Sequence, residues 1–317
     1  MTQVEDTADI RCEPRGAVKR ADRLAIDVCI CTYRRPAVVE ALAAVAAQDE
    51  RQAIALRVIV ADNAPGTEAR ASICAAAEKL GLDLVYIHAP EKNISIARNA
   101  CLTAARADWL AFVDDDERPS PVWLSELIAE AQRGNWDAVL GPVQAEYPER
   151  APSWLRICDL HSTQPVWVHG RIETGYTGNV LLRRALIDRA DLAFRTELGR
   201  SGGEDIDFFY RLRDAGGRIG YAPAALIHEP VPLERTSLGY LLRRNFRQGQ
   251  THARRLKRCS QIRPSIFHLP LAMAKALLLG IAACRPGTAA RNRNLARAAL
   301  HCGVAARLAG VAEIKLY

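Results

Sequence analysis

Short apolar runs alternate with amphipathic segments along the first 113 residues. The runs are rich in β-branched residues and are too short for helices, so they predict buried strands, whereas the segments between them show helical spacing. Strands are expected at 24–32, 56–61, 82–88 and 109–113, and helices at 37–47, 68–80 and 94–105. This alternation predicts βαβ units and an α/β fold with a mostly parallel, doubly wound, Rossmann-like sheet.

The pattern is less regular between residue 120 and residue 234. Helices are expected at 123–132 and 205–215, strands at 138–144 and 178–183, and short extended pieces at 218–222 and 225–228. Residues 151–172 are rich in Trp, Pro and His and show no clear periodicity. The pattern therefore predicts no regular element there.

The last 83 residues are helical in pattern and strongly basic. Residues 243–257 form a basic stretch, and 292–308 predict a basic amphipathic helix. Residues 264–284 contain an apolar run that Pro270 and Lys275 interrupt. A spanning helix needs about 20 apolar residues with few charges, so a helix at a membrane surface or packed in the protein is favoured over a membrane span.

Charge is distributed unevenly along the chain. The net charge is +7, but residues 235–317 carry sixteen Lys and Arg against one acidic residue, Glu313, and the preceding part is net acidic. A basic tail predicts an anionic partner: a membrane surface, a lipid phosphate or nucleic acid. The alternative is a solvated face decorated with arginine. We expect a membrane surface rather than nucleic acid.

The nine cysteines include no CxxC pair, which argues against a zinc site, and their scattered positions suit a reducing cytosol. No apolar signal segment is evident at the N-terminus. We therefore expect a cytoplasmic protein, peripheral at the inner face of the membrane. Its expected organisation is a flexible lead-in at 1–23, a catalytic domain at 24–234 and a basic helical segment at 235–317. The catalytic domain would have a nucleotide-binding half (24–120) and an acceptor half (121–234).

The strongest chemical signal is the acidic run Asp114-Asp115-Asp116-Glu117, directly after the strand expected at 109–113. Several carboxylates released at one strand end repel one another unless a cation binds. Oxygen ligands suit Mg²⁺ or Mn²⁺, and such ions also bind substrate phosphates. Asp114 and Asp116 are alternate residues and can converge on one ligand. The alternative is a solvated turn that caps the next helix.

A second signal is Gly202-Gly203-Glu204-Asp205. The glycines give the backbone freedom before a helix N-terminus, where the macrodipole favours an ionised Asp205. Such a carboxylate can accept a proton from a bound hydroxyl, and the alternative is a simple N-cap.

Three further polar residues follow predicted strands or open a predicted helix. Asp62 ends a strand and can accept a hydrogen bond from a nucleotide, or form an Asx turn. Arg98 can offset diphosphate charge or form an ion pair. His228 ends an apolar run and is either a structural residue or a third metal ligand. GxGxxG after the first strand and GxxxxGK[ST] are absent from the sequence.

Taken in order, these pieces resemble the inverting family-2 glycosyltransferases of GT-A fold, and among them the succinoglycan-type enzymes of bacterial exopolysaccharide synthesis. The resemblance spans about residues 25–230. The segments that carry it are DVCICTYRRP (27–36), VIVADNA (58–64), NISIARNACL (93–102), WLAFVDDDERPSPVWL (109–124), TGNVLLRR (177–184) and GGEDIDFFYRLRDAGG (202–217). One departure is Arg34, where many members carry Asn.

The resemblance implies a role for each matching residue. Asp62 would contact the donor's nucleobase, with Thr32 and Tyr33 lining the same pocket, and Arg98 would lie near the donor. Asp114 and Asp116 match the DxD motif, with Asp116 as the direct metal ligand and His228 as a further one. Asp205 matches the catalytic base of the ED pair, and Asp115 and Glu204 are expected to contact substrate.

The implied function is transfer of a sugar from a nucleotide-sugar donor, a UDP-sugar, to a hydroxyl of a glycan or lipid-linked acceptor, with Mg²⁺ or Mn²⁺ and with inversion. Two alternatives stay open from the residues alone. One is a metal-dependent nucleotidyltransferase that uses Arg34 and Arg35 for a triphosphate, and the other is a non-catalytic membrane or nucleic-acid adaptor built on the basic tail.

Overall fold

The structure is a computed structural model that describes residues 10–12, 23–49, 53–259 and 264–314. The chain divides into two compact units. The first consists of the chain up to Gln144 together with Thr163–Arg200 and Glu204–Glu229. The second consists of Ala145–Ser162, Ser201–Gly203 and the chain from Pro230 onward. The two units are described separately below.

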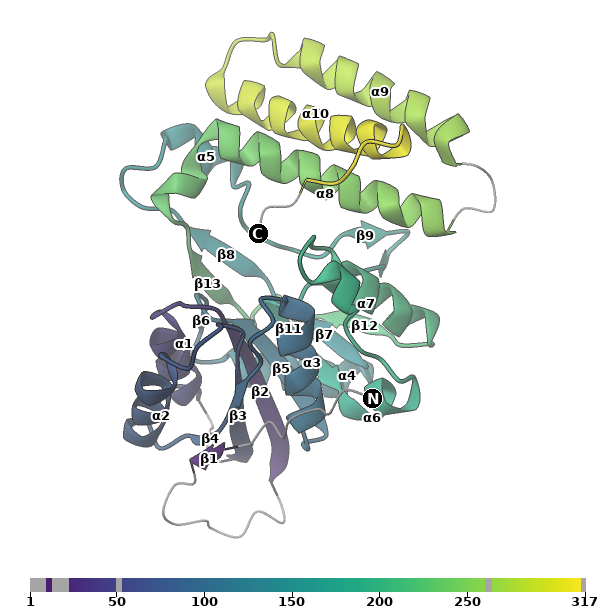
Figure 1. The fold of residues 1–317 in the computed structure, drawn as a ribbon. Coiled ribbons are helices and arrows are strands. Elements are labelled where there is room, and N and C mark those ends of the chain that lie inside the picture. The colour runs from purple at the N-terminus through teal and green to yellow at the C-terminus, as the bar shows by residue number, and fades with distance from the viewer. Residues whose placement is uncertain (1–9, 13–22, 50–52, 260–263, 315–317) are drawn as a thin grey trace. The chain divides into compact units, whose positions relative to one another are not determined.

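The first unit is built on an eight-stranded sheet with strand order β1-β4-β3-β2-β5-β11-β7-β12 (Figure 1). The strands β4, β3, β2 and β5 are parallel, β11 runs antiparallel between β5 and β7, and β12 is parallel to β7. Their bounds are β1 Ile10–Cys12, β2 Leu24–Thr32, β3 Ile54–Asp62, β4 Asp83–His88, β5 Trp109–Asp114, β7 Ala138–Leu140, β11 Asn179–Arg183 and β12 Ile219–Tyr221.

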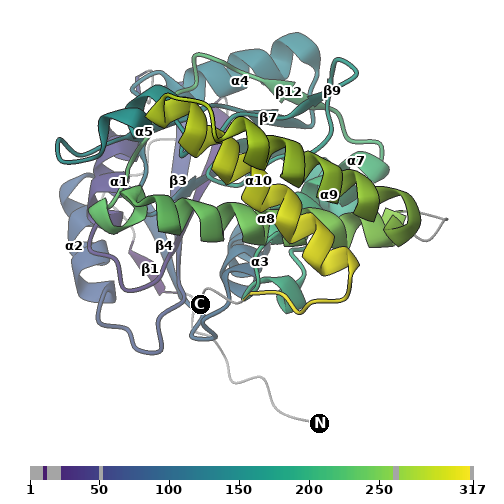
Figure 2. The ribbon, with the colours of Figure 1, turned by 90° about the horizontal axis from the view of Figure 1, so that it is seen from above.

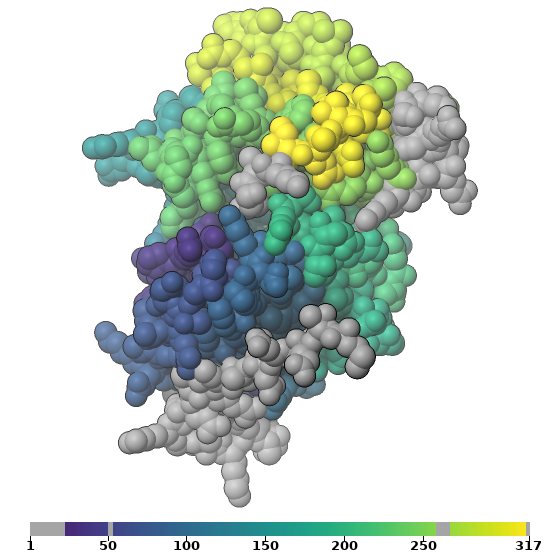
Figure 3. Space-filling view, in the orientation of Figure 1, coloured from purple at the N-terminus to yellow at the C-terminus, as the bar shows by residue number. Residues whose placement is uncertain are grey.

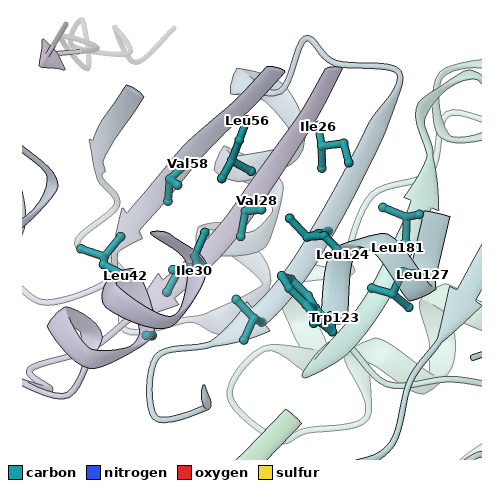
Figure 4. Packing of buried hydrophobic residues seen from close by; sticks show 14 of the residues in the cluster. Ile26, Val28, Ile30, Leu42, Leu56, Val58, Trp123, Leu124, Leu127 and Leu181 are labelled. Carbon is teal, nitrogen blue, oxygen red and sulfur yellow. The ribbon is translucent and has the colours of Figure 1, made fainter. Parts of the chain in front are cut away.

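Helices cover both faces of this sheet, which explains why its central strands are apolar throughout. Alternate residues of β2 point to opposite faces: Val28 and Ile30 join one buried cluster and Cys29 joins another. The first cluster, shown in Figure 4, packs α1 Val38–Ala46, α2 Arg70–Lys79 and α4 Trp123–Gly134 on the sheet. The second packs α3 Ile94–Ala104, α6 Arg184–Arg189 and α7 Glu204–Asp214. The expectation of a doubly wound α/β fold is confirmed.

The later part of the sequence contains more elements than its pattern predicted. The single strand expected at 138–144 is two strands, β7 and β8 Val143–Glu146, because Gly141-Pro142 interrupts the run. A second sheet has the order β6-β13-β8, with β6 Arg118–Pro119 and β13 Ile227–Pro230. Residues 151–172, expected to be irregular, hold α5 Ser153–Cys158 and the hairpin β9 Trp167–Val168 and β10 Arg171–Ile172. A 3₁₀ turn lies at Thr196–Leu198.

The second unit consists mainly of three long helices: α8 Leu238–Cys259, α9 Pro264–Ala282 and α10 Thr288–Leu308, preceded by a 3₁₀ turn at Leu233–Thr236. Helix α10 packs against α8 and α9 and also contacts α5 (Figure 2). Two glycines permit the close approach of α8 and α10. A Cβ at Gly249 would collide with the backbone of Leu300, and a Cβ at Gly303 would collide with the backbone of Phe246.

The helical C-terminal segment agrees with its predicted character. In the described part of the chain, every helix falls short of the length and apolarity that crossing a membrane requires. The second unit also takes in Ala145–Ser162 and Ser201–Gly203, which the sequence analysis assigned to the catalytic domain. Residues 1–9 and 13–22 of the expected lead-in lie outside the described residues, while β1 within it pairs antiparallel with β4.

Candidate active site

Three of the predicted residues stand at the carboxyl ends of neighbouring parallel strands. Thr32 ends β2 and lies opposite Asp62 at the end of β3, and Cys31 of β2 lies opposite Asp114 at the end of β5. Ligands of open α/β sheets bind outside the carboxyl ends of their strands. The register therefore gathers Thr32, Asp62 and Asp114 where a ligand is expected.

Asp115 and Asp116 are held by an arginine of the first loop. Asp115 is buried and accepts hydrogen bonds from Thr32 Oγ1 at 2.7 Å and from Arg35 Nη1 at 2.9 Å. The same Nη1 lies 2.5 Å from Asp116 Oδ2. Burial raises the pKa of Asp115 to about 6, against the opposing effect of Arg35. From the sequence, Arg35 was predicted only as a triphosphate ligand of the alternative enzyme, and its contact with the acidic run was not predicted.

Glu117 fixes the backbone of the acidic run. Its carboxylate is buried and accepts a hydrogen bond from the Asp114 N–H at 2.8 Å. Burial, together with repulsion from Asp114, raises the pKa of Glu117 well above its usual value. A Cβ at Gly178 would lie 2.6 Å from Glu117 Oε1, so the glycine makes room for this side chain. Sequence reasoning named Glu117 in the cluster but gave it no role of its own.

Arg98 links the acidic run to the start of α7. It lies on the first turn and a half of α3, whose N-cap is Asn93, and its side chain is buried. Its Nη1 lies 2.6 Å from Glu204 Oε1, and its Nη2 lies 3.8 Å from Asp114 Oδ1. Its guanidinium also stands over the ring of Phe194. One buried guanidinium thus lies beside carboxylates from two distant parts of the chain.

Asp205 is partly buried beside this pair on the first turn of α7. Burial raises its pKa to about 7, repulsion from Glu204 adds to that rise, and Arg98 opposes it. Its Oδ1 accepts a hydrogen bond from the N–H of Ile206 at 2.7 Å. A carboxyl group that titrates near neutral pH is suited to accept and release a proton under physiological conditions.

The two glycines before α7 have the backbone conformation that the sequence suggested. Gly202 and Gly203 have φ angles of +83° and +87°. Within the second unit, Gly203 lies against Thr251 of α8, and Arg247 and Arg254 of α8 donate to the carbonyls of Ser201 and Gly202 at 3.5 and 3.4 Å. Helix α8 therefore holds the loop that leads to Glu204.

Asp62 and Tyr33 differ in how far they are open to a ligand. Asp62 is fully buried, and its two carboxylate oxygens accept hydrogen bonds from the Ala64 N–H and from Tyr86 Oη. The Asx turn is therefore present, and contact with a nucleobase stays a prediction. Tyr33 is partly exposed, and Lys92 stands over its ring at 5.8 Å.

His228 lies on β13, where its backbone pairs with that of Arg118 of β6, two residues beyond Asp116. Among the residues that the structure describes, no three His, Cys, Asp or Glu side chains converge as metal ligands would. A role for His228 in metal binding stays a prediction.

Asp114 and Asp116 nevertheless have the chemistry that a divalent ion requires. Both offer carboxylate oxygens, the ligands that Mg²⁺ and Mn²⁺ prefer. Repulsion between the two helps to raise the pKa of Asp114, after burial and against Arg98. Arg35 and Arg98 already place positive charge beside these two carboxylates, and binding of a divalent ion here stays a prediction.

Comparisons with known proteins identify the family to which the chain belongs. Residues 27–190 match the family described as Glycosyl transferase family 2. The chain is 46% identical over 298 residues to the succinoglycan biosynthesis protein ExoM of Rhizobium meliloti strain 1021, covering 93% of this chain and 96% of that protein. It is 29% identical over 180 residues to a pre-mycofactocin glycosyltransferase of Mycobacterium tuberculosis, covering 54% of this chain and 37% of that protein.

Among solved structures, the fold is similar to that of TarS residues 1–349 from S. aureus in complex with UDP-GlcNAc. The TM-score is 0.52, the sequence identity is 16%, and the match covers 87% of this chain and 90% of that chain. At this identity the match is evidence for the fold alone.

Proposed function

Because this chain belongs to the Glycosyl transferase family 2, and so is a glycosyltransferase, we propose that it moves a hexosyl group from a UDP-sugar to an acceptor hydroxyl with inversion. We assign the reaction to the assembly of a bacterial polysaccharide or glycoconjugate, in line with the name of the Rhizobium relative. The observation that carries the proposal is the Arg98 ion pair, which brings the start of α7 to the acidic end of β5.

Asp205 acts as the general base. Its carboxylate removes the proton from the acceptor hydroxyl as that oxygen attacks the anomeric carbon from the face opposite the leaving group. A single displacement of this kind inverts the anomeric configuration and needs no covalent intermediate. The raised pKa of Asp205, about 7, supports the assignment because it brings proton affinity near the working pH.

Arg98 stabilises the leaving nucleoside diphosphate. Its guanidinium is fixed by Glu204 and has donors left to bind phosphate oxygens as negative charge grows on them. Asp114 and Asp116 would hold Mg²⁺ or Mn²⁺, which supplies further positive charge to the diphosphate when bound. Asp115 keeps the first loop in place through Thr32 and Arg35.

The donor's base lies against the first loop in this proposal. Tyr33 offers a partly exposed ring for stacking, and Asp62 would have to exchange one of its internal hydrogen bonds to contact the base. The acceptor is a glycan or a lipid-linked sugar. Trp167 supports that class because its side chain is 56% exposed and presents an apolar ring of the kind that stacks on sugars.

The proposed location is the cytoplasmic side of the membrane, where the protein is peripheral. The charge of the segment from Arg235 to Tyr317 supports this proposal, because an anionic lipid surface attracts a basic segment.

The deciding experiment compares donors and the Asp205 variant. Wild-type protein is incubated with a panel of labelled nucleotide sugars, and in parallel with sugar 1-phosphate and UTP. We expect release of UDP from one UDP-sugar and no formation of a UDP-sugar. Asp205→Asn should lower turnover by about 10²-fold or more, as loss of a general base does, with donor affinity nearly unchanged.

The matched control is Asp214→Asn, which removes an exposed carboxylate at the other end of the same helix. It should leave turnover unchanged. Formation of UDP-sugar from UTP would instead establish the nucleotidyltransferase, and full activity of Asp205→Asn would refute the assignment of the base.

A further inference from the structure

Helix α9 turns a large apolar face to solvent. Six of its side chains are between 51% and 66% exposed: Phe267, Leu271, Met273, Leu277, Leu278 and Ile281. In the space-filling view of Figure 3, the atoms of α9 form the outer layer of the C-terminal helices. Six large apolar side chains on one helix leave a large apolar surface exposed, and such surfaces mark sites that bind a partner.

The exposed face is distinct from the face that α9 uses within its own unit. Positions 267, 271, 274, 278 and 281 follow one another at intervals of four and three, so they share one side of the helix. Ala272 and Ala283 lie on the opposite side and are buried, where α9 packs against α10. The packing of the three helices is therefore complete without the apolar face.

The C-terminal helices that include this face are rich in basic residues. The sequence has no acidic residue from Arg235 to Ala312, and the basic side chains Lys257, Lys275, Arg285 and Arg297 are exposed. Lys275 lies four residues after Leu271 and three before Leu278, so it borders the apolar face directly. A long lysine side chain in this position can keep its ammonium at the level of lipid headgroups while its stem lies on apolar surface.

We propose that the apolar face of α9 inserts in plane into the surface of an anionic lipid bilayer, with Lys275 and the neighbouring arginines on the headgroups. The combination of an apolar face and cationic borders is the pattern of interfacial helices. Nucleic acid would meet the charge but leave six apolar side chains in water. A second copy would cover the face but bring two strongly basic segments together, which costs free energy.

This inference rests on the proposed peripheral location and deepens it by naming the helix and the face that touch lipid. It also explains why α9 is apolar all round although it is interrupted by Pro270 and Lys275. Its inner side packs on protein, and its outer side packs on acyl chains. An acceptor carried on lipid would then lie in the same bilayer to which the enzyme is bound.

The test is vesicle flotation of the full chain, which needs neither donor nor acceptor and so can fail while sugar transfer stands. Vesicles of phosphatidylcholine alone are compared with vesicles of equal parts phosphatidylcholine and phosphatidylglycerol. Wild-type protein should float with the anionic vesicles, and Leu278→Glu should bind them at least about tenfold more weakly, because it places a charge in the acyl region. Lys275→Gln with Arg285→Gln should weaken binding by about tenfold, selectively on the anionic vesicles.

The matched control is Leu233→Glu, which replaces another exposed leucine of the same unit, 49% exposed, outside α9. It should float like the wild type, and circular dichroism melts should show that all variants are folded. The proposal is overturned if the wild type stays at the bottom of the gradient or if Leu278→Glu floats like the wild type. It is also overturned if Leu233→Glu binds the vesicles as weakly as Leu278→Glu does. A dimer that Leu278→Glu dissociates, with no flotation of the wild type, would assign the face to a second copy.

Discussion

Arg98 and Glu204 form an ion pair in the protein interior, with Nη1 of the arginine 2.6 Å from Oε1 of the glutamate. The other carboxylate oxygen, Oε2, is buried and has no hydrogen-bond partner among the described residues. Glu204 Oε2 can therefore still accept a hydrogen bond. Next to it stands Asp205, whose pKa depends on both partners in opposite senses.

Glu204→Gln should move the pH dependence of the reaction. Repulsion from Glu204 helps to hold the pKa of Asp205 up, so its removal lets Asp205 ionise at lower pH. The acid limb of kcat/KM should therefore shift below about pH 7. The free energy of unfolding of the variant should be lower by about 1–3 kcal/mol, because Arg98 is left as a buried charge without its charged partner. The exposed Glu149→Gln is the control, and an unmoved acid limb would contradict this role.

Activity of the wild type should fall as the solution becomes more acidic than about pH 7. The base must be ionised, and burial raises the pKa of Asp205 to about 7, so the fraction of competent enzyme declines below that value. A profile of kcat/KM between pH 5 and pH 9 measures this limb. The residual activity of Asp205→Asn should lack it, and a limb that persists there belongs to another group.

The same raised pKa makes a prediction about stability. A carboxyl whose pKa is higher in the folded state than its unfolded value of about 3.9 costs the native state stability once the pH exceeds that unfolded value. The cost grows up to about pH 7 and is constant above. Asp205→Asn removes it, so the variant should gain melting temperature over the wild type by more at pH 8 than at pH 5. An equal gain at both pH values would show that burial does not disfavour the charge.

The sequence predicted the sheet well because its strands are buried on both faces. The expected bounds of β2 coincide with the observed ones, and those of β5 and β11 differ by one residue, since an unbroken apolar run marks such strands plainly. The short elements were not predicted, because they contain no such apolar run. The hairpin of β9 and β10 has only two residues in each strand. Its turn at His169-Gly170 has positive φ angles, which the pattern of apolar and polar residues does not predict.

The candidate site was predicted in its parts but not in its contacts. That Asp114 follows a buried strand is visible in the sequence, whereas Arg98 and Glu204 are 106 positions apart and meet only through the fold. The family resemblance implied that Arg98 lies near the donor and that Glu204 contacts substrate, but it did not predict that the two side chains pair. The role of Arg35 was missed because a long side chain reaches several neighbours, and the register of the first loop against β5 decides which one it contacts.

Arg35→Gln should strengthen binding of Mn²⁺ in the absence of nucleotide. The guanidinium of Arg35 bridges Asp115 and Asp116, so a metal at Asp116 has to compete with a resident cation. The arginine is partly exposed, and loss of such a pair is worth about 1 kcal/mol, or about fivefold in affinity. Electron paramagnetic resonance of free Mn²⁺ measures the change. Arg34→Gln is the control because that guanidinium lies over the ring of Tyr33 instead, and weaker Mn²⁺ binding by Arg35→Gln would contradict the competition.

Gly203→Ala should impair catalysis more than an equally strained substitution elsewhere. Gly203 and Gly216 both have φ near +87°, so alanine at either position costs about 1–2 kcal/mol of backbone strain. They differ in surroundings: a Cβ at Gly203 would collide with Cγ2 of Thr251, whereas a Cβ at Gly216 meets no atom within 4 Å among the described residues. Both variants should therefore melt at lower temperature, but only Gly203→Ala displaces the loop that leads to Asp205.

We expect turnover to fall at least about tenfold in Gly203→Ala, because an error of about 1 Å in the position of a catalytic group has such effects, and to stay near the wild-type value in Gly216→Ala. The double variant Gly203→Ala/Thr251→Ser removes the colliding methyl group and should recover part of the lost turnover while the backbone strain, and so the lowered melting temperature, remains. If turnover and melting temperature fall and recover together in all three variants, the loop supports the fold and does not position the base.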